Sequence, residues 1–366
     1  MQLENLNIAA IILAAGFSKR MGTFKPLLPV GEETALQRCV RILKEAGVRD
    51  IIVVTGHRKI DSALLENYAD TKIIHNTDYA NGMYSSVKTG VENLSNGVDG
   101  FFVLPADCCA VSPSELGMLT GKFCSDVVIP EYKGKRGHPP LFPSVYIKDI
   151  LSYDGADGLK GIRRRMPGLE VSMQGPGTLL DMDTPEDYAA LLDFLGFSTY
   201  PDKQFSMNLL QEHNVPKHII DHGIQVASQA HQIAGLMVQQ GASINMELLE
   251  VSCLLHDIMR TEPDHARRAA ELLLEKGYPR AAIIVSKHMD IDFPITDVGE
   301  IEILYLADKM CRHGRVVSID KTKQDMESKF SSDPKALAAA YARLSNAQTI
   351  LDLLQNQYGI CTVNLL

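Results

Sequence analysis

The chain has 366 residues, of which 45% are hydrophobic and 22% charged, enough for two globular domains at roughly 100–200 residues per domain. Its formal net charge of −9 argues against a nucleic-acid-binding protein, so any phosphate site has to be a local cationic pocket. The seven cysteines contain no Cys-x-x-Cys spacing and fit buried free thiols, and without a basic leader or an apolar run of roughly 18 residues we expect a cytoplasmic protein with no membrane partner.

The first predicted element is a buried strand over residues 8–13, which are apolar and rich in β-branched side chains. The small residues 14–16 follow and let a ligand approach the main chain closely. Arg20 and Lys25 come next, and a loop with unpaired backbone N–H groups and cations suits a nucleoside triphosphate. The loop is not a Walker loop, which needs a lysine directly after Gly22, nor a dinucleotide fingerprint. Taken alone, a turn with solvated cations is the simpler interpretation.

Helical and strand patterns then alternate along the chain. We predict helices over residues 34–46, 62–67 and 85–94, and strands over residues 50–55, 72–75 and 100–104. This alternation predicts an α/β fold with a Rossmann-like, mostly parallel sheet covered by helices on both faces. Ligands of such sheets bind at the carboxyl ends of the strands.

Several polar residues follow these strands. Ser85 and Ser86 begin a predicted helix, where a serine commonly caps the first turn. Asp107 ends the strand in FFVLPADCC and is well placed to hold Mg²⁺ against triphosphate oxygens, although capping the next turn is the simpler role. His138 lies in the segment KGKRGHPPLF, where a lone histidine is more often structural. Asp183 precedes a capping-box-like helix start, TPED.

Three strings in this half resemble the MobA-like nucleotidyltransferases, and especially the molybdenum cofactor cytidylyltransferases. They are LAAG-x-S-x-RMG-x-x-K-x-LLP at 13–29, GM-x-S-S at 82–86 and GHP-x-LF at 137–142. The resemblance implies Mg²⁺-dependent transfer from CTP to molybdopterin, which gives the cytosine dinucleotide and pyrophosphate, with a molybdenum hydroxylase as recipient. The chain departs from the family at Cys108 and Cys109, where a Gly-Asp-x-Pro-like string is usual, and at Lys160, where arginine is common.

The resemblance also assigns roles to individual residues. It implies a nucleotide site at Leu13, Ala14, Ala15, Gly16, Arg20, Lys25, Ser85 and Ser86. It implies that Asp107 and Asp183 hold Mg²⁺, with Asp181 the weaker candidate, and that Arg20 and Lys25 neutralise the triphosphate. On the acceptor side it implies Gly137, His138 and Lys160.

The α/β pattern breaks between residues 196 and 213, so we predict domains over residues 1–198 and 205–366. No strand pattern follows the break, which predicts an all-α second domain. The predicted helices lie near 217–241, 244–258, 264–276, 279–289, 298–312 and 333–356.

Six ionisable side chains lie on or beside these apolar helices, where burial is costly unless they are paired or bound to metal. They are His222, His256, Asp257, His265, His288 and Asp308. Their order over residues 215–315 resembles the HD superfamily of metal-dependent phosphohydrolases. The resemblance implies a minimal metal site at His222, His256, Asp257 and Asp308, with Asp257 also catalytic and with the other two histidines matching members that hold two metals.

Histidine and carboxylate ligands together suit Mn²⁺, Fe²⁺ or Co²⁺ better than Mg²⁺. Lys309 and Arg312 lie just past Asp308 and are candidates to hold a leaving phosphate. Two alternatives stay open. The first domain could use another nucleoside triphosphate or a sugar-phosphate acceptor, and the second could be a non-catalytic nucleotide sensor.

Overall fold

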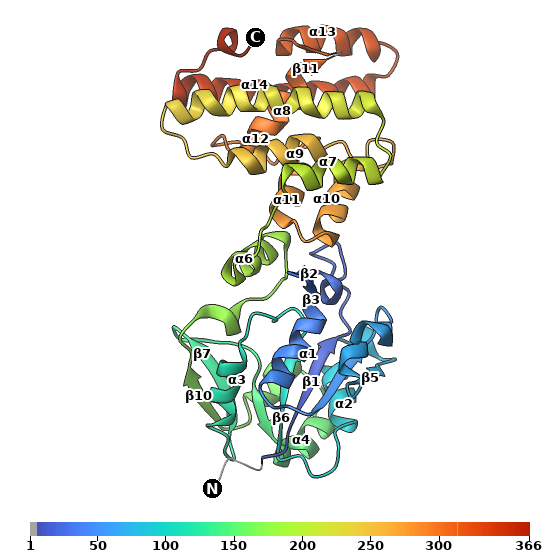
Figure 1. The fold of residues 1–366 in the computed structure, drawn as a ribbon, viewed down its shortest axis with the longest axis vertical. Helices are drawn as coiled ribbons and strands as arrows, with labels where there is room; N and C mark the ends of the chain where they lie inside the picture. The colour runs from blue at the N-terminus through green and yellow to red at the C-terminus, as the bar shows by residue number, and fades with distance from the viewer. Residues whose placement is uncertain (1–5, 313) are drawn as a thin grey trace. The chain divides into compact units, whose positions relative to one another are not determined.

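The computed structural model describes residues 6–312 and 314–366, so the first five residues of the segment considered for a leader lie outside it. The chain divides into two compact units, the first ending at Phe197 and the second beginning at Ser198. The first is an α/β unit and the second is built from helices (Figure 1). The predicted fold class, a mostly parallel α/β sheet followed by a helical unit, is confirmed.

The first unit is organised around one large sheet, whose strand order is β10-β7-β9-β6-β1-β4-β5, with β8 paired to β7. Its strands are β1 (Ile8–Ala14), β4 (Asp50–Thr55), β5 (Lys72–His75), β6 (Gly100–Pro105), β7 (Val127–Tyr132), β8 (Lys135–Arg136), β9 (Leu141–Pro143) and β10 (Gly168–Ser172). Strands β4, β1 and β6 run parallel, whereas β9 is antiparallel to both β6 and β7. The sequence predicted β1, β4, β5 and β6 but not the strands beyond them.

Strand β1 is central because every residue in it is apolar and buried. Helix α2 packs closely on it: a Cβ atom at Gly90 would lie 2.3 Å from Ile11 Cγ2, so only glycine permits this approach. The helices of this unit are α1 (Ala35–Glu45), α2 (Met83–Glu92), α3 (Pro113–Thr120), α4 (Ile147–Ser152), α5 (Gly158–Arg163) and α6 (Pro185–Leu195).

Short elements join these strands and helices. The 3₁₀ segments are η2 (Lys25–Leu27), η3 (Ser62–Tyr68), η4 (Tyr79–Asn81), η5 (Ser144–Tyr146) and η6 (Pro176–Leu179), and a small hairpin joins β2 (Pro29–Val30) to β3 (Glu33–Thr34). The helix predicted over 62–67 is therefore a kinked 3₁₀ segment. The capping box predicted before α6 is present, because Thr184 and Asp187 bond each other's backbone N–H groups.

The second unit is helical, as predicted. Its elements are α7 (Lys203–Glu212), α8 (Lys217–Gln239), α9 (Met246–Leu255), α10 (His265–Glu275), α11 (Pro279–Ser286), α12 (Glu300–Met310), β11 (Cys311–Arg312), β12 (Arg315–Val316), α13 (Ile319–Lys329), α14 (Pro334–Tyr358) and η7 (Thr362–Leu365). Three features differ from the prediction. Helix α7 lies within the expected break, because Asp202 caps its first turn; α13 was not predicted; and a two-residue-per-strand hairpin interrupts the helices.

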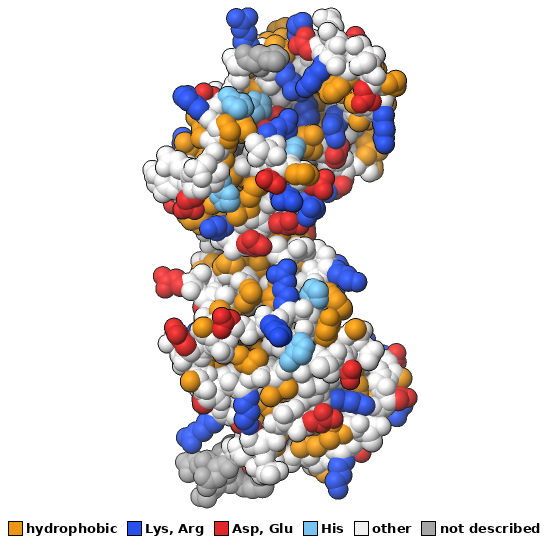
Figure 2. Space-filling model, turned by 90° about the vertical axis from the view of Figure 1, so that its right-hand side faces the viewer, with side chains coloured by type: hydrophobic (Ala, Val, Ile, Leu, Met, Phe, Trp, Pro, Cys, Tyr) orange, Lys and Arg blue, Asp and Glu red, His pale blue; other side chains and the backbone are white. Residues whose placement is uncertain are grey.

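The structure can be compared with the expectations drawn from composition on three points: surface charge, cysteine burial and membrane-spanning helices. Lys/Arg and Asp/Glu side chains are interspersed over much of the face drawn in Figure 2. Five of the cysteines are buried, as expected, but Cys124 and Cys361 are exposed. Among the described helices, none is both long and apolar enough to cross a membrane.

Candidate active sites

The first candidate site is a pocket of about 320 Å³ at the carboxyl ends of β1 and β6. It is lined by Leu13, Ala14, Ala15, Gly16, Ser86, Lys25, Asp107 and Asp183, among others. Strands β1 and β6 are neighbours and parallel, so the loops that follow them meet at one edge of the sheet. Ser18 holds the first loop in shape, since its hydroxyl accepts a hydrogen bond of 3.1 Å from the Lys25 backbone N–H.

Lys25 lies between the two carboxylates predicted to hold Mg²⁺. Its Nζ donates to Asp107 Oδ2 at 2.9 Å and to Asp183 Oδ1 at 2.6 Å. Arg20 donates to the other oxygen of Asp183 at 2.7 Å. Burial alone would lower the pKa of Lys25, but the charges of Asp107 and Asp183 outweigh it and raise that pKa. The ammonium is therefore firmly charged and neutralises both acids.

A third acid, Asp181, is close to the same group. Burial raises its pKa, and the negative charges of Asp183 and Asp107 raise it further. Burial would also raise the pKa of Asp183, but its bonds to Lys25 and Arg20 hold that pKa below its usual value. Hard carboxylate oxygens gathered at a strand end are the donor set that Mg²⁺ prefers, so Asp107 and Asp183 fit such an ion.

The two predicted serines have different surroundings in the structure. Ser86 is buried and lines the pocket, whereas the Ser85 hydroxyl donates to the backbone oxygens of Gly82 and Asp78. Asn76, which the sequence reasoning missed, is buried and donates to both hydroxyls, at 2.8 Å to Ser85 and 3.0 Å to Ser86. Its position directly after a predicted strand was the available signal.

The predicted acceptor-side residues do not line this pocket. Gly137 lies against Thr178, whose carbonyl oxygen would be 2.3 Å from a Cβ at that position, so glycine is needed there for packing. His138 is half-buried, and its enclosed Nδ1 atom has no hydrogen-bond partner in the described part of the chain. Burial lowers the pKa of His138, and the charge of Asp107 opposes that shift. Lys160 lies in α5 with its side chain exposed. An acceptor role for these residues stays a prediction.

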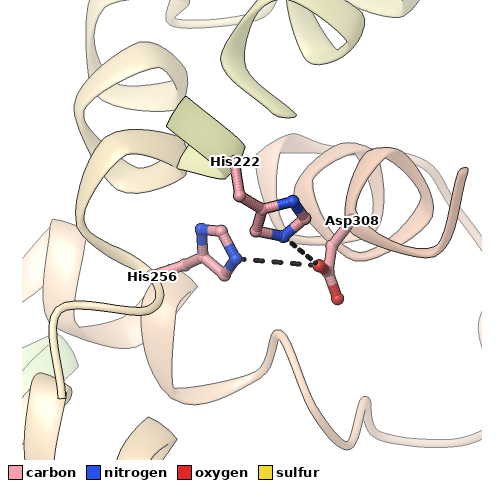
Figure 3. A group of neighbouring side chains, drawn as sticks. All are labelled: His222, His256 and Asp308. Carbon is pink, nitrogen blue, oxygen red and sulfur yellow. Dashed lines mark hydrogen bonds and ion pairs between the residues drawn. The ribbon is translucent and has the colours of Figure 1, made fainter. Parts of the chain in front are cut away.

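The second candidate site contains all six predicted ligands, divided into two groups of three. Within each group, the donor atoms lie within 4.8 Å of one another. In the first group, His222 Nε2 lies 3.1 Å and His256 Nε2 3.7 Å from Asp308 Oδ1 (Figure 3). Helix α8 brings His222 here by packing closely on α9, where a Cβ at Gly223 would be 3.1 Å from the Leu254 carbonyl oxygen. Asp308 comes from the last turn of α12.

The second group consists of Asp257, His265 and His288. Asp257 Oδ1 lies 3.3 Å from His265 Nε2 and 3.5 Å from His288 Nε2. The other carboxylate oxygen of Asp257 lies 3.6 Å from His256 Nε2 in the first group. Asp257 thus stands between the two groups and faces both.

The histidine tautomers fit metal binding. His256 Nδ1 lies 2.7 Å from the Cys253 carbonyl and His288 Nδ1 lies 2.8 Å from that of Val285. A carbonyl only accepts, so each Nδ1 carries a proton, and in the neutral ring this leaves Nε2 able to coordinate a metal. His256 Nε2 is buried and has no hydrogen-bond partner among the described residues. A metal ion would satisfy this atom, and histidine with carboxylate suits Mn²⁺, Fe²⁺ or Co²⁺.

Family models match a stretch of each unit. The MobA-like NTP transferase domain matches residues 10–170 and the HD domain matches residues 219–313. The chain carries a MobA-like NTP transferase domain and an HD domain. The two resemblances seen in the sequence are confirmed, and the first unit belongs to a nucleotidyltransferase family.

Relatives of the MobA-like domain are found among characterised proteins. The molybdenum cofactor cytidylyltransferase of Escherichia coli K12 is 29% identical over 184 residues, which cover 50% of this chain and 93% of that protein. Purine catabolism protein PucB of Bacillus subtilis 168 is 27% identical over 192 residues, covering 50% and 94%. Among solved structures, Rv0371c of Mycobacterium tuberculosis H37Rv superposes with a TM-score of 0.46 at 24% identity, covering 51% and 98%.

Lys309 in the HD domain bonds to two residues of the metal cluster. It is buried, and its Nζ donates to Asp308 Oδ2 at 2.7 Å and to the His288 carbonyl at 2.6 Å. Burial would raise the pKa of Asp308, but Lys309 and the histidines hold it well below its usual value. Through these contacts Lys309 orients Asp308, and its part in holding a leaving phosphate stays a prediction. Lys309 and Arg312 both line a cleft beside the cluster.

Proposed function

We propose that the MobA-like domain transfers CMP from CTP to molybdopterin. The observation that carries this proposal is the meeting of the 14–16 loop, Lys25, Asp107 and Asp183 in one pocket. The segment GHPPLF and the relative named molybdenum cofactor cytidylyltransferase favour CTP and molybdopterin over other pairs.

The chemistry asks little of the protein beyond placing two anions and neutralising charge. An oxygen of the acceptor phosphate forms a bond to the α-phosphorus of CTP, and the bond to pyrophosphate breaks. The acceptor phosphate is already ionised, so no general base is needed. Arg20 and Lys25 would turn to the triphosphate oxygens, which frees Asp107 and Asp183 to hold Mg²⁺, whose charge would stabilise the transferring phosphoryl group.

The test is an incubation of the purified full chain with each nucleoside triphosphate, with and without molybdopterin, followed by measurement of pyrophosphate. We expect pyrophosphate release with CTP, Mg²⁺ and molybdopterin together. We expect it to fall by at least about tenfold when GTP replaces CTP, as for a site that hydrogen-bonds its base. Equal turnover of the two nucleotides would contradict cytidylyl transfer and leave the fold unaffected.

We further propose that the HD domain hydrolyses a phosphoester. The observation that carries this proposal is the buried His256 Nε2, which has no hydrogen-bond partner among the described residues and faces two carboxylates at 3.6 and 3.7 Å. A metal held by the six residues would lower the pKa of bound water towards about 7. In the net reaction a water oxygen bonds to phosphorus, the ester P–O bond breaks, and a proton from the water ends on the leaving oxygen. Lys309 keeps Asp308 oriented throughout.

Metal analysis tests this second activity directly. The purified chain is expected to carry Mn, Fe or Co, and Asp257→Ala is expected to reduce the bound metal by tenfold or more, since Asp257 faces both groups (roughly 1.4 kcal/mol or more). His231→Ala is the matched control, because His231 lies on α8 with its ring against the Ala227 carbonyl, outside the cluster. Equal metal content in wild type and Asp257→Ala, with no hydrolysis, would favour the sensor alternative.

A further inference from the structure

The metal cluster of the HD domain opens into a cleft of about 720 Å³. His222, Asp257 and Asp308 line one part of it, and helices α13 and α14 supply much of the remainder. Pockets of roughly 300–1,000 Å³ hold organic ligands. The cleft is therefore large enough for much more than an inorganic phosphate at the metal ligands.

One wall of this cleft is apolar. Met326 in α13 and Phe330 just after it face small residues of α14, namely Ala336, Ala339 and Ala340. Residues spaced by three and four lie on one face of a helix, so the alanines leave a shallow, flat strip along α14. A flat apolar strip beside an aromatic ring suits the ring system of an organic substrate.

The outer lining of the cleft is also cationic. Arg312, Lys329 and Arg343 all line it. The Nε atom of Arg312 is buried and has no hydrogen-bond partner in the ranges 6–312 and 314–366. Arginine presents several donors in a fixed fork, which matches phosphate and carboxylate oxygens.

The acid in that part of the lining does not cancel these cations. Asp325 is paired with Lys321 at 2.8 Å, one turn earlier on α13. Asp257 and Asp308 belong to the metal cluster. Arg343 is itself paired with Asp290, at 3.0 and 3.2 Å. The positive charge of the outer cleft, away from the place where the scissile phosphate would bind, therefore rests on Arg312 and Lys329.

We propose that the HD cleft takes an organic bisphosphate, meaning a ring-bearing compound with two separate phosphates. One phosphate would lie at the metal cluster, the ring would pack on the α13–α14 wall, and the second phosphate would bind Arg312 with help from Lys329. This inference rests on the proposed phosphohydrolase function, and it names the class of substrate for that site.

The test uses the full chain with Mn²⁺ and three probes: adenosine 3′,5′-bisphosphate, AMP and inorganic pyrophosphate. Hydrolysis gives kcat/KM, and calorimetric titration gives affinity independently of turnover. We expect the bisphosphate to exceed AMP by about tenfold or more in both readouts, which is the effect of one charge-assisted contact. Arg312→Met is expected to remove most of that difference. The matched control is Arg315→Met, in the opposite strand of the same hairpin and outside the cleft lining.

The outcomes separate this inference from the activity on which it rests. Hydrolysis of AMP and the bisphosphate at equal rates, unaffected by Arg312→Met, would overturn the inference and leave the phosphohydrolase in place. Preference for pyrophosphate over both organic probes would also overturn it. Tight, Arg312-dependent binding of the bisphosphate without hydrolysis under any metal would support the ligand class and contradict the phosphohydrolase. Loss of the preference in Arg315→Met as well would count against a role specific to Arg312.

Discussion

Replacing Lys25 by methionine is expected to lower nucleotidyl transfer by the full chain between about tenfold and about a hundredfold. The Lys25 ammonium contacts two carboxylates at 2.6 and 2.9 Å and lies beside the loop that would hold the triphosphate. A charge-assisted hydrogen bond contributes about 1.5–3 kcal/mol, and each 1.36 kcal/mol corresponds to a factor of about ten in rate. Methionine keeps the length of the side chain and removes the charge, so packing in this partly buried position is largely preserved.

Lys19→Met is the matched control for this variant. Lys19 lies in the same loop, but its Nζ is placed over the ring of Phe17 and forms no contact with Asp107 or Asp183. We expect it to retain transfer within about twofold, as is usual for a surface substitution. Pyrophosphate release under saturating CTP and a thermal melt of each variant complete the measurement. Full activity in a folded Lys25→Met protein would show that the lysine only balances the two acids.

The MobA-like half shows which parts of a site can be predicted from local sequence. The strand over 8–13 and the residues that follow it form a continuous stretch, so their pattern alone places Arg20 and Lys25 in one loop. The strand-end rule placed Asp107 correctly at the edge of the sheet. The local sequence, however, does not show that Lys25 bridges Asp107 and Asp183, because these acids lie 82 and 158 positions after it in the chain.

The antiparallel strand β9 escaped prediction for a related reason. It has three residues, Leu141–Pro143, which is too short for any periodicity, and it is held by pairing with β6 and β7 on either side. Its proline and the preceding Pro-rich segment favour a loop when only local pattern is considered. Long-range pairing therefore decided its conformation.

The HD half shows where residue type predicts a ligand but spacing does not predict its neighbours. The six ligands were identified because ionisable groups on apolar helices need partners, and because their order resembles that of the HD superfamily. The division into two groups depends on how α8 packs against α9. It also depends on the turns after α9 and α11, which no sequence pattern predicts. Helix α13 has few apolar residues, and only Ile319 and Thr322 are buried within it. Its sequence therefore has no clear apolar face, and its place in the cleft wall was not predicted.

Substituting one acid in each half is expected to silence the two reactions separately. Asp107→Ala should lower nucleotidyl transfer on the order of a hundredfold and leave hydrolysis within about twofold, and Asp257→Ala should do the reverse. Each half contains a complete set of the residues assigned to its own chemistry, with Asp107 bonded to Lys25 and Asp257 placed among His256, His265 and His288. The measurement is pyrophosphate release and phosphoester hydrolysis by the same preparation.

Asp107→Asn and Asp257→Asn distinguish loss of charge from loss of folding. The amide preserves the shape of the side chain and removes the charge that a metal or Lys25 needs. Asp257 is the more demanding position: removing its carboxylate leaves His265 and His288 facing each other at 3.1 Å without a shared acceptor. A lower melting temperature is therefore expected for Asp257→Ala, and Asp257→Asn should be milder in stability yet equally inactive in hydrolysis. If either asparagine variant, still folded, lost both reactions, the two sites would be strictly coupled, and the fusion would have to act as one composite enzyme.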